Sequence, residues 1–473
     1  MGYIEGEDPN QMVMFPETLD EYIKADNPVR FIGAFVENLD LQELGFQRAV
    51  PNDRGRNAYH PRMLLSLYIY GYLNRIRSSR KLERELGRNL ELMWLMRKLT
   101  PDHKTIADFR KDNLNAIAGV CRRFKQLCGE MGLFGGELIG ADGSKFRAVN
   151  SKERSFNARR LERAKKRVGQ DIDEYLREME QCDKKEAGIE QPTAEELKEK
   201  IEKLKQRQVK YEQIGQELSK SEDGQVSLTD PDSRLMKSRQ GTHTGYNAQI
   251  AVDSKHKLIV AEDVCGSRSD RGQLTNIAKQ AKEVLGVESL DVVADMGYYD
   301  CQDIKNCEEE SITPYVSKPA VSRKTGLFIK EDFEYDSQKD MYVCPTGAEL
   351  KYVTHGKERE RGMKYYMNRE ACSECALKHQ CTRAAYRRIK RLENEGVMEA
   401  MATRVRGHPE KMSLRKGVVE HPFGTIKRGM GQGYFLMKTT VKVRTELKLT
   451  TLAYNMKRVI NIVGVTKMIE ALG

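Results

Sequence analysis

The apolar positions of the first 135 residues recur at helical spacing. One face carries Leu64, Leu65, Tyr68 and Tyr72, and a second stripe, spaced mostly three or four apart, carries Ile106, Phe109, Ile117, Val120, Phe124 and Leu127. Such stripes are typical of helices that pack one side into a core. Ser78 and Ser79 precede Arg80 and Lys81, and serine is a favoured N-cap, so a short basic helix is predicted to begin there. Residues 1–135 are therefore expected to form a helical domain.

After Gly135 and Gly136 the pattern changes to short apolar runs bounded by turn residues. Strands are predicted at 138–141, 247–252, 258–261, 290–294 and 312–316, with an amphipathic helix near 271–285. The turn at 253–257 joins two of these runs and favours a hairpin. Strands that alternate with helices in this order indicate an α/β body.

Residues 151–220 interrupt this body with a highly charged segment of 18 basic and 16 acidic residues. Its apolar residues recur every seven positions: Leu161, Val168 and Tyr175 first, then Leu197, Leu204, Tyr211 and Leu218. A break around Gly188 and Pro192, followed by a capping-box pattern from Thr193 to Glu196, separates the two series. We predict an antiparallel helical hairpin that serves as an arm for DNA or for a partner subunit. The alternative is a solvated helical pair without a partner.

Composition argues against a disordered chain and against a membrane-spanning protein. The chain has 473 residues, 39% hydrophobic and 32% charged, which excludes disorder throughout. No apolar run approaches the roughly 18 residues of a bilayer helix, and the first residues are acidic rather than apolar, so a cytoplasmic protein without a membrane association is expected.

Positive charge is concentrated in two blocks. The net charge is +11, yet residues 411–460 alone hold eleven Lys or Arg against two acids, and residues 62–111 hold twelve against five. Blocks of this kind fit the neutralisation of nucleic-acid phosphates. A basic helix starting at Arg80 and Lys81 is a candidate to enter a DNA groove. The alternative interpretation is a solvated surface rich in lysine.

Two of the predicted strands lead into an aspartate that is closely followed by glycine, at Asp142 and at Asp295. Sites in open α/β sheets gather at strand ends, where side chains from separate segments converge. Carboxylates there bind Mg²⁺, and two such ions about 4 Å apart activate the attacking oxygen and stabilise the leaving oxygen of a phosphodiester. Each aspartate could equally be a turn former or a helix cap.

The third acid of such a site is expected to be Glu420. Pro422 is best tolerated in a first helical turn, so a helix is predicted to start near Glu420, with Lys427 about two turns further along the same face. Glu446 is the other acid between 411 and 460 and is the alternative third ligand. Glu420 could also be an N-terminal helix residue without a metal.

Motifs in a fixed order along the chain then carry a family resemblance. They are Asp26–Arg30, Tyr59–Pro61, Tyr70–Tyr72, Ser78–Arg80, Pro101–Ile106, Asp142–Lys145, Gly245–Gln249, Ala294–Tyr298, Glu420–Gly424 and Ala453–Asn455. With these motifs the chain resembles bacterial insertion-sequence transposases of the Asp-Asp-Glu (DDE) class, which have a ribonuclease-H-like catalytic core.

The resemblance implies that Asp142, Asp295 and Glu420 are catalytic residues that hold two Mg²⁺ ions, with Mn²⁺ able to substitute. It also implies double-stranded DNA as the partner, both as terminal inverted repeats and as target, a homodimer that pairs the two ends, and a nucleoid-associated protein. The family's arginine four residues before the glutamate is replaced here by Lys416, with Arg415 one position further back. The expected DNA contacts are Arg80, Lys81, Arg415, Lys416, Lys427 and Arg428.

The expected organisation is a helical DNA-binding domain at 1–135 and a ribonuclease-H-like core at 136–150, 226–320 and 411–473. The core is interrupted by the charged hairpin at 151–225 and by a cysteine-bearing insertion at 321–410. The expected activity is Mg²⁺-dependent cleavage at the element's ends followed by strand transfer. Two alternatives remain open: a ribonuclease-H-like nuclease without strand transfer, and a non-catalytic DNA-binding protein derived from a transposase.

The insertion has a cysteine pattern of its own. Cys344 is followed by Pro345, Thr346 and Gly347, as in a zinc-knuckle turn, and Cys372, Cys375 and Cys381 follow further on. Four thiolates could hold a tetrahedral structural Zn²⁺, with His379 as a substitute ligand. The alternative is four reduced cysteines that only pack.

Overall fold

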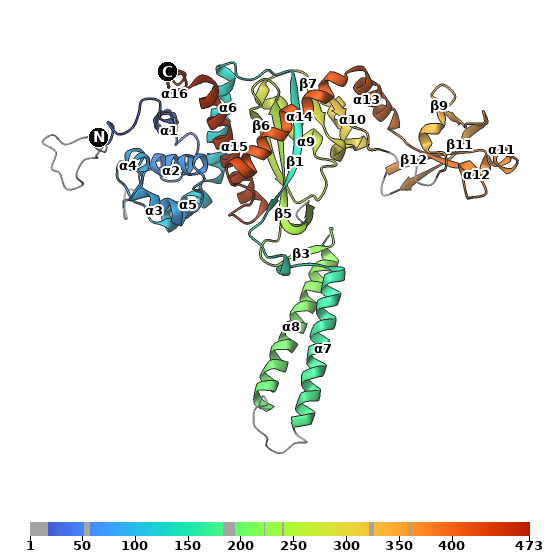
Figure 1. The fold of residues 1–473 in the computed structure, drawn as a ribbon, viewed down its shortest axis with the longest axis horizontal. Helices are drawn as coiled ribbons and strands as arrows, with labels where there is room; N and C mark the ends of the chain where they lie inside the picture. The colour runs from blue at the N-terminus through green and yellow to red at the C-terminus, as the bar shows by residue number, and fades with distance from the viewer. Residues whose placement is uncertain are drawn as a thin grey trace, which may run out of the picture.

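The computed structural model describes residues 18–51, 57–182, 194–221, 223–238, 241–320, 326–358 and 361–473. A central sheet lies between helices, with an N-terminal group of helices on one side (Figure 1). A long helical hairpin projects from the body, and a small β-rich segment extends from the side opposite the N-terminal helices (Figure 1). None of the helices in these ranges combines the length and the hydropathy that crossing a bilayer requires.

The N-terminal region is helical, as predicted. Its helices are α1 (Pro28–Glu37), α2 (Pro61–Leu73), α3 (Ser79–Leu86), α4 (Leu90–Leu95), α5 (His103–Asp112) and α6 (Leu114–Glu130). The side chain of Asn27 caps α1 and that of Asp102 caps α5, while Ser78 occupies the N-cap of α3 without a side-chain hydrogen bond. The predicted start of the short basic helix is therefore confirmed.

The central sheet is a mixed parallel and antiparallel one. Its strands are β1 (Leu138–Arg147), β4 (Arg234–Ser238), β5 (Gly241–Asp253), β6 (Ile259–Cys265), β7 (Leu290–Ala294) and β8 (Ile312–Val316). The order is β4-β5-β1-β7-β8, and β6 pairs with β5 on the side away from β1. β1 is antiparallel to β5 and parallel to β7, which is parallel to β8. The predicted strands and the mixed α/β class are confirmed.

Helices cover both faces of this sheet and give three layers. The face that includes Ile139, Ala141 and Val292 packs against α9 (Leu274–Leu285), α10 (Cys301–Glu309) and α13 (Glu395–Gly407). The opposite face, with Phe146 and Tyr246, packs against α14 (Pro409–Gly424) and α15 (Thr440–Val463). The π-helix η4 (Thr425–Gly429) follows α14 directly, and α16 (Val465–Glu470) follows α15.

The N-terminal helices share one hydrophobic core with this second face, and α15 lies between them and the sheet. Buried ion pairs reinforce the junction. The Glu262 carboxylate on β6 lies 2.7 Å from Lys125 of α6 and 3.0 Å from Lys448 of α15. Arg77, just before α3, pairs with Glu446 of α15 at 3.3 Å. The N-terminal helices are therefore joined to the central sheet over an extended buried contact.

The charged segment forms the predicted helical hairpin, with α7 (Ala158–Cys182) and α8 (Ala194–Lys220) side by side (Figure 1). The short 3₁₀ turn η1 (Lys152–Arg154) and the paired strands β2 (Ser155–Asn157) and β3 (Gln225–Ser227) form its base. Apolar side chains are buried between the helices: Leu161, Val168, Leu197, Ile201 and Ile214. The predicted break around Gly188 and Pro192 and the cap at Thr193 lie outside the described residues.

The outlying segment is a small five-stranded antiparallel sheet in the order β13-β12-β11-β10-β9. The strands are β9 (Glu334–Asp336), β10 (Met341–Val343), β11 (Glu349–Glu358), β12 (Arg361–Met367) and β13 (Arg388–Leu392). The 3₁₀ turn η3 (Lys330–Asp332) precedes them, and the short helices α11 (Arg369–Ser373) and α12 (Lys378–Cys381) connect β12 to β13. Helix α13, which follows β13, packs on α10 and β8 of the central body.

Gly140 allows α14 to pack closely on β1. A Cβ atom built at position 140 would overlap Val419 Cγ1 and lie 3.0 Å from Val418 Cγ1, both on α14. We expect Gly140→Ala to lower the free energy of unfolding by about 1–3 kcal/mol through overpacking. Chemical denaturation measures the loss. Gly417→Ala on α14, where a Cβ meets nothing within 4 Å, is the matched control, and helix propensity makes it neutral or stabilising by up to about 1 kcal/mol. Equal effects of the two changes would contradict the close packing.

Candidate active site

The parallel pairing of β1 and β7 brings Asp142 and Asp295 together. Gly140 is the register partner of Val293, so each aspartate lies two residues beyond this pair on its own strand. Neighbouring strands are about 5 Å apart, and the two aspartates therefore lie side by side. The prediction that Asp142 stands at a strand end is wrong, because β1 continues to Arg147 along β5. Only β7 ends here, and Asp295 caps the 3₁₀ turn η2 (Met296–Tyr298) by accepting from the Gly297 amide at 2.7 Å.

Both aspartates lie on the face of the sheet that α14 covers. Side chains alternate along a strand, and Ile139, Ala141 and Ala294 belong to the core on the α9 side. Leu138 and Val293 pack instead with Met412 of α14. By this alternation, Asp142 and Asp295 share the α14 face. Two carboxylates are thus presented to one helix.

The helix that carries Glu420 begins earlier than predicted. α14 starts at Pro409, which occupies the first helical turn, so Glu420 lies in the second half of the helix and not at its start. Pro422 lies inside the helix. Proline there removes one backbone hydrogen bond, and the chain continues from α14 into the π-helix η4, where the Met430 amide donates to the Thr425 carbonyl at 2.8 Å. The prediction failed because Pro422 was assigned to the role that Pro409 fills.

Two basic side chains of this helical stretch approach Asp142. Lys427 of η4 donates from Nζ to Ser144 Oγ at 2.5 Å and to the Lys145 carbonyl at 2.8 Å. Its Nζ also lies 4.6 Å from the centre of the Phe146 ring. Arg415 of α14 is close enough for its charge to lower the pKa of Asp142. The expected basic groups therefore flank the first aspartate.

The electrostatics of Asp142 are those of a crowded, largely buried carboxyl group. The pKa of Asp142 is raised to about 7, chiefly by burial and in addition by the charges of Asp295 and Asp270, although the Gly143 amide and Arg415 act to lower it. Burial also lowers the pKa of Lys427 to about 8, although the charge of Asp142 raises it. The charge of Asp295 therefore disfavours the ionised form of Asp142, and a cation between the two carboxylates would relieve this repulsion.

Glu420 lies on α14, the helix that covers the aspartates, but its side chain does not contact either of them. Its side chain is exposed to solvent. Within the described ranges, no three His, Cys, Asp or Glu side chains are grouped as metal ligands. The structure brings two of the three expected acids together and leaves the third on the covering helix.

Glu446, the alternative third ligand, has a structural role. Its side chain is fully buried and accepts from the amides of Leu436 and Met437 at 2.9 and 3.0 Å, in addition to its pair with Arg77. Burial raises the pKa of Glu446. These partners join α15 to the segment after η4.

Asp270 is an acidic residue of this region that the sequence analysis did not identify. A Cβ at Gly143 would overlap its Oδ1, and a Cβ at Gly297 would lie 3.3 Å from its Oδ2. One carboxylate therefore lies against both Gly143 of β1, next to Asp142, and Gly297 of the turn that follows Asp295. Because Gly143 points away from the α14 face, Asp270 lies behind β1, opposite Asp142.

Two buried amides hold Asp270 in place. Asn247 and Gln249 of β5 donate to its Oδ1 at 2.7 and 2.8 Å, and Lys145 Nζ lies 3.7 Å away. The Gln249 carbonyl in turn accepts from the Tyr298 hydroxyl of η2. Asn247 and Gln249, two polar residues within an otherwise apolar strand, are the sequence signal that could have indicated this network. Asp270 itself lay in a loop with no distinguishing pattern.

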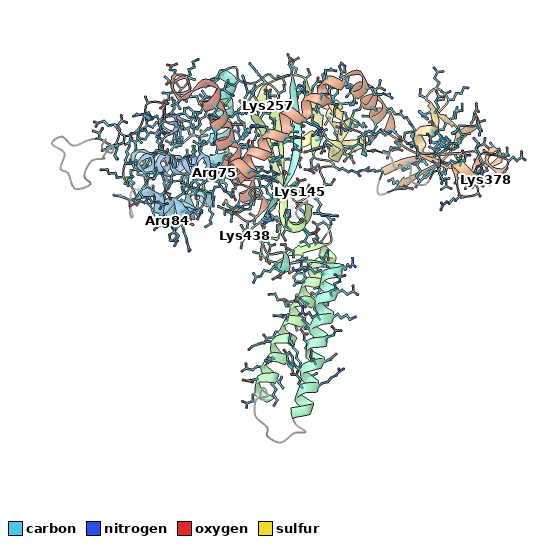
Figure 2. All side chains as sticks on the ribbon, viewed as in Figure 1. Arg75, Arg84, Lys145, Lys257, Lys378 and Lys438 are labelled. Atoms are coloured by element: carbon cyan, nitrogen blue, oxygen red, sulfur yellow. The ribbon has the colours of Figure 1, made fainter. Side chains whose placement is uncertain are left out.

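The remaining basic residues of the expected DNA surface are exposed. Arg80 and Lys81 lie on α3, Lys416 on α14 and Arg428 on η4. Basic side chains occur in every part of the molecule, with Arg84 in the N-terminal helices, Lys145 in the central sheet and Lys378 in the outlying segment (Figure 2).

A cavity of about 340 Å³ lies between the central body and the outlying segment, close to the turn after Asp295. Its lining includes Arg271, Tyr299, Asp300 and Glu395 of the central body and Lys330, Arg361 and Lys390 of the outlying segment. Arg361 donates to Asp300 at 2.5 Å across this boundary. Four basic and two acidic side chains line the cavity, and Asp142, Asp295 and Glu420 are not among its lining residues.

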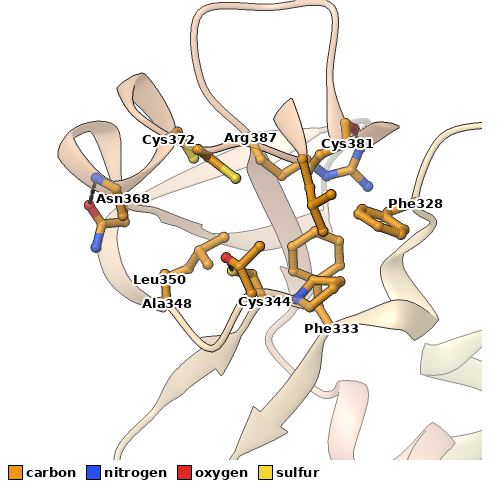
Figure 3. A pocket seen from close by; sticks show the side chains of 14 residues that line it. Phe328, Phe333, Cys344, Ala348, Leu350, Asn368, Cys372, Cys381 and Arg387 are labelled. Carbon is orange, nitrogen blue, oxygen red and sulfur yellow. Dashed lines mark hydrogen bonds between the residues drawn. The ribbon is translucent and has the colours of Figure 1, made fainter. Parts of the chain in front are cut away.

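The four expected zinc ligands line one small cavity. Cys344, Cys372, Cys375 and Cys381 surround about 30 Å³ of space together with Phe328, Phe333 and Leu350 (Figure 3). Burial raises the pKa of Cys381, the charge of Arg387 lowers it, and the other three cysteines raise it. His379, the expected substitute, is exposed and is not among the lining residues.

Comparison with known proteins gives two family matches. Residues 17–112 match a transposase domain (DUF772), and residues 343–460 match a transposase DDE domain. The second match includes Glu420 and Lys427. Comparison with curated protein sequences gives no significant match. A solved structure of a piggyBac transposase synaptic complex with hairpin DNA is similar at 9% identity and a TM-score of 0.31 over 95% of this chain and 80% of that one, which is too low to show a common fold.

The raised pKa of Asp142 predicts a pH-dependent cost in stability. Between about pH 4 and pH 7 the folded protein holds a proton that the unfolded chain has released, so the contribution of Asp142 to stability falls as the pH rises through this window. Asp142→Asn removes the ionisation. In buffer with EDTA, we expect this variant to be more stable than the unsubstituted protein by roughly 2–4 kcal/mol at pH 8. The two proteins should converge near pH 4, and a constant difference in melting temperature from pH 4 to pH 8 would contradict the assignment.

Proposed function

We propose that this chain, which its two matched domains identify as a DDE-type transposase, cleaves DNA at the terminal inverted repeats of its element and joins the freed ends to target DNA. The observation that carries the proposal is the placement of Asp142 and Asp295 side by side on the face of the sheet that α14 covers. A matched DDE domain gives the class of reaction. The pair of aspartates gives a place where that reaction could occur.

The sheet supports a ribonuclease-H-like core. Three antiparallel strands, β6, β5 and β1, are followed in space by the parallel strands β7 and β8, with helices on both faces. We propose that residues 136–150, 226–320 and 411–473 form this core and that 1–135 is the DNA-binding domain. The hairpin at 151–225 is an insertion between β1 and β5. Because α13 packs on the core, we place the end of the cysteine-bearing insertion at Leu392 rather than at residue 410.

The donor set at the site fits a hard divalent cation. Mg²⁺ prefers oxygen ligands, and the two adjacent aspartates supply them, with Glu420 on the covering helix as the proposed third. Bound Mg²⁺, or Mn²⁺ in its place, would polarise a phosphodiester and lower the pKa of an attacking water. Two like charges held together at the site are a reason for a cation to bind there. The exposed Glu420 side chain is not held by packing and remains available to join them.

The reaction proposed is two in-line displacements at phosphorus. Water first attacks a phosphodiester at the element end, and the bond to the 3′ oxygen breaks to leave a 3′-hydroxyl and a 5′-phosphate. The 3′-hydroxyl then attacks a target phosphodiester, forms the new bond and displaces a target 3′ oxygen. The protein's share of such catalysis is positioning and electrostatic stabilisation.

The basic groups supply the grip on DNA. Lys427 and Arg415 flank Asp142, where they would meet the phosphates next to the scissile bond. Arg428 and Lys416, together with Arg80 and Lys81 of the N-terminal domain, are exposed and provide further phosphate contacts. The cation-lined cavity beside Asp300 offers a path for the strand across the insertion. A homodimer would bring two such sites to the two ends, with the helical hairpin as a contact arm.

A nuclease without strand transfer is the alternative function, and a DNA-binding protein without catalysis is the third. The adjacent aspartates favour an enzyme over a DNA-binding protein without catalytic activity. Products joined to target DNA distinguish a transposase from a nuclease.

The catalytic assignment predicts that Asp295→Asn abolishes Mg²⁺-dependent cleavage of labelled element ends, because the amide is a poor ligand for a hard cation. Glu420→Gln should act in the same way. DNA binding, measured by mobility shift, should be largely retained in both variants. Glu410→Gln, in the first turn of the same helix, is the matched control and should cleave normally. Cleavage by Asp295→Asn at the unsubstituted rate would refute the assignment, and cleavage by Glu420→Gln would remove only the third ligand.

Asp270 should act as a positioning residue. We expect Asp270→Ala to slow cleavage at least 10-fold and to raise the Mg²⁺ concentration needed for half-maximal rate, since it leaves both aspartate turns without their common contact. Asp263→Ala, on the nearby strand β6 and paired with Arg444 at 2.6 Å, is the control for the loss of a carboxylate. A change in melting temperature without a change in the Mg²⁺ dependence would show that Asp270 is only structural.

A further inference from the structure

The β-rich insertion has an unusually small core for its length. Its core cluster contains five buried hydrophobic side chains: Phe333, Tyr342, Leu350, Tyr366 and Ile389. Segments below about 70 residues seldom gain enough stability from a core of this size and commonly need a disulfide or a metal. Cys344 and Cys381 pack against the edge of this small core. The cysteines are therefore located where such a cross-link would act.

All four cysteines of the insertion are reduced and line one small cavity, although the chain between them is long. Cys344 follows β10, Cys372 lies on α11, Cys375 follows that helix and Cys381 ends α12. They line the same cavity of about 30 Å³, with Cys372 and Cys381 on one side of it and Cys344 on the other (Figure 3). The elements that carry them are turns and helices of four or five residues. Such elements have little structure of their own to fix their ends.

We propose that these four cysteines bind one structural Zn²⁺ ion, which holds α11, α12 and the turn after β10 together. Four thiolates in tetrahedral arrangement are a preferred ligand set for zinc, whereas Mg²⁺ prefers oxygen ligands. Binding converts four thiols into four thiolates and releases four protons, with no change in oxidation state. This site is separate from the acidic site of the core in position and in ligand chemistry.

The sulfurs line the cavity but do not surround one point, so binding would draw them inward. Cys344 Sγ is now 3.0 Å from the Thr346 hydroxyl, a weak contact that a zinc–sulfur bond would replace. The Gly347 amide donates to the Cys344 carbonyl at 2.8 Å, and the Cys344 amide donates to the Ala348 carbonyl at 2.9 Å. This tight turn presents the Cys344 sulfur toward the cavity. The short helices α11 and α12 would therefore have to move to bring the other sulfurs to the metal.

Zinc in the insertion would also stabilise its contact with the core. Arg361 of β12 pairs with Asp300, which caps α10 just after the Asp295 turn. Lys330 pairs with Glu395 of α13 at 2.6 Å. An insertion that loses its zinc is expected to lose these contacts first, while the sheet of the core remains folded.

The test measures metal, not DNA chemistry, and so it is independent of the proposed transposase activity. The full chain, purified without chelator and without a metal-affinity step, should contain about one zinc per chain by mass spectrometry of the metal. The double variant Cys372→Ser, Cys375→Ser should contain less than about one tenth of that amount. Cys265→Ser, on β6 outside the insertion, is the matched control and should retain its zinc.

Cobalt provides a second measurement on the unsubstituted protein, in case the double variant folds poorly. After removal of zinc by a chelator, added Co²⁺ should give thiolate-to-metal charge-transfer absorption and tetrahedral ligand-field bands, which zinc then abolishes. Hydrogen exchange should show that the chelator raises exchange in 326–392 and leaves β1 and β7 protected. A protein that contains no zinc and gives no thiolate–cobalt absorption would overturn the proposal, as would a double variant with an unchanged zinc content.

Discussion

The parallel pairing of β1 with β7 is the constraint on which the site depends. Because Gly140 and Val293 are partners, the two chains deliver Asp142 and Asp295 to the same level and the same face. A slip of one residue would turn one aspartate toward the α9 side, since successive side chains alternate across a sheet. The burial of Ile139 and Ala141 on one face helps to fix the register, because a slip would turn them toward α14, where Val418 and Val419 leave no room for a side chain at position 140. The core thus determines the position of the acids.

Helix α14 covers the face of the sheet on which this pair of acids lies. Its close approach requires the absence of a side chain at Gly140, and Val418 and Val419 occupy the space that results. The helix continues into a π turn, a feature that is often found at functional sites, and this turn presents Lys427 to Ser144. Behind β1, Asp270 fills the space left by Gly143 and Gly297. Glycines on both sides of the aspartates therefore allow the close packing that positions them.

The sequence was sufficient to predict the elements that depend on local residue patterns. Periodicity predicted the strand at 290–294 and the two helices of the charged hairpin. Spacing indicated that the four cysteines of the insertion would lie near one another, and they line one cavity. The start of α14 was predicted wrongly because two prolines compete for the first turn and only tertiary packing on β1 selects Pro409. Asp270 could not be identified, because its role comes from contacts with three separate segments, β1, β5 and η2. The position of Glu420 could not be predicted either. Tertiary packing places its helix, α14, whereas the exposed Glu420 side chain is not held by packing.

The central claim is that Asp142 and Asp295 hold divalent metal at the point where DNA is cut. Anomalous scattering from Mn²⁺ in crystals of the protein with a cleaved element end tests it most directly. The account predicts a manganese peak within about 2.5 Å of carboxylate oxygens of both aspartates and next to the terminal 3′ oxygen. A DNA end bound elsewhere on the protein, or manganese held without either aspartate, would contradict it.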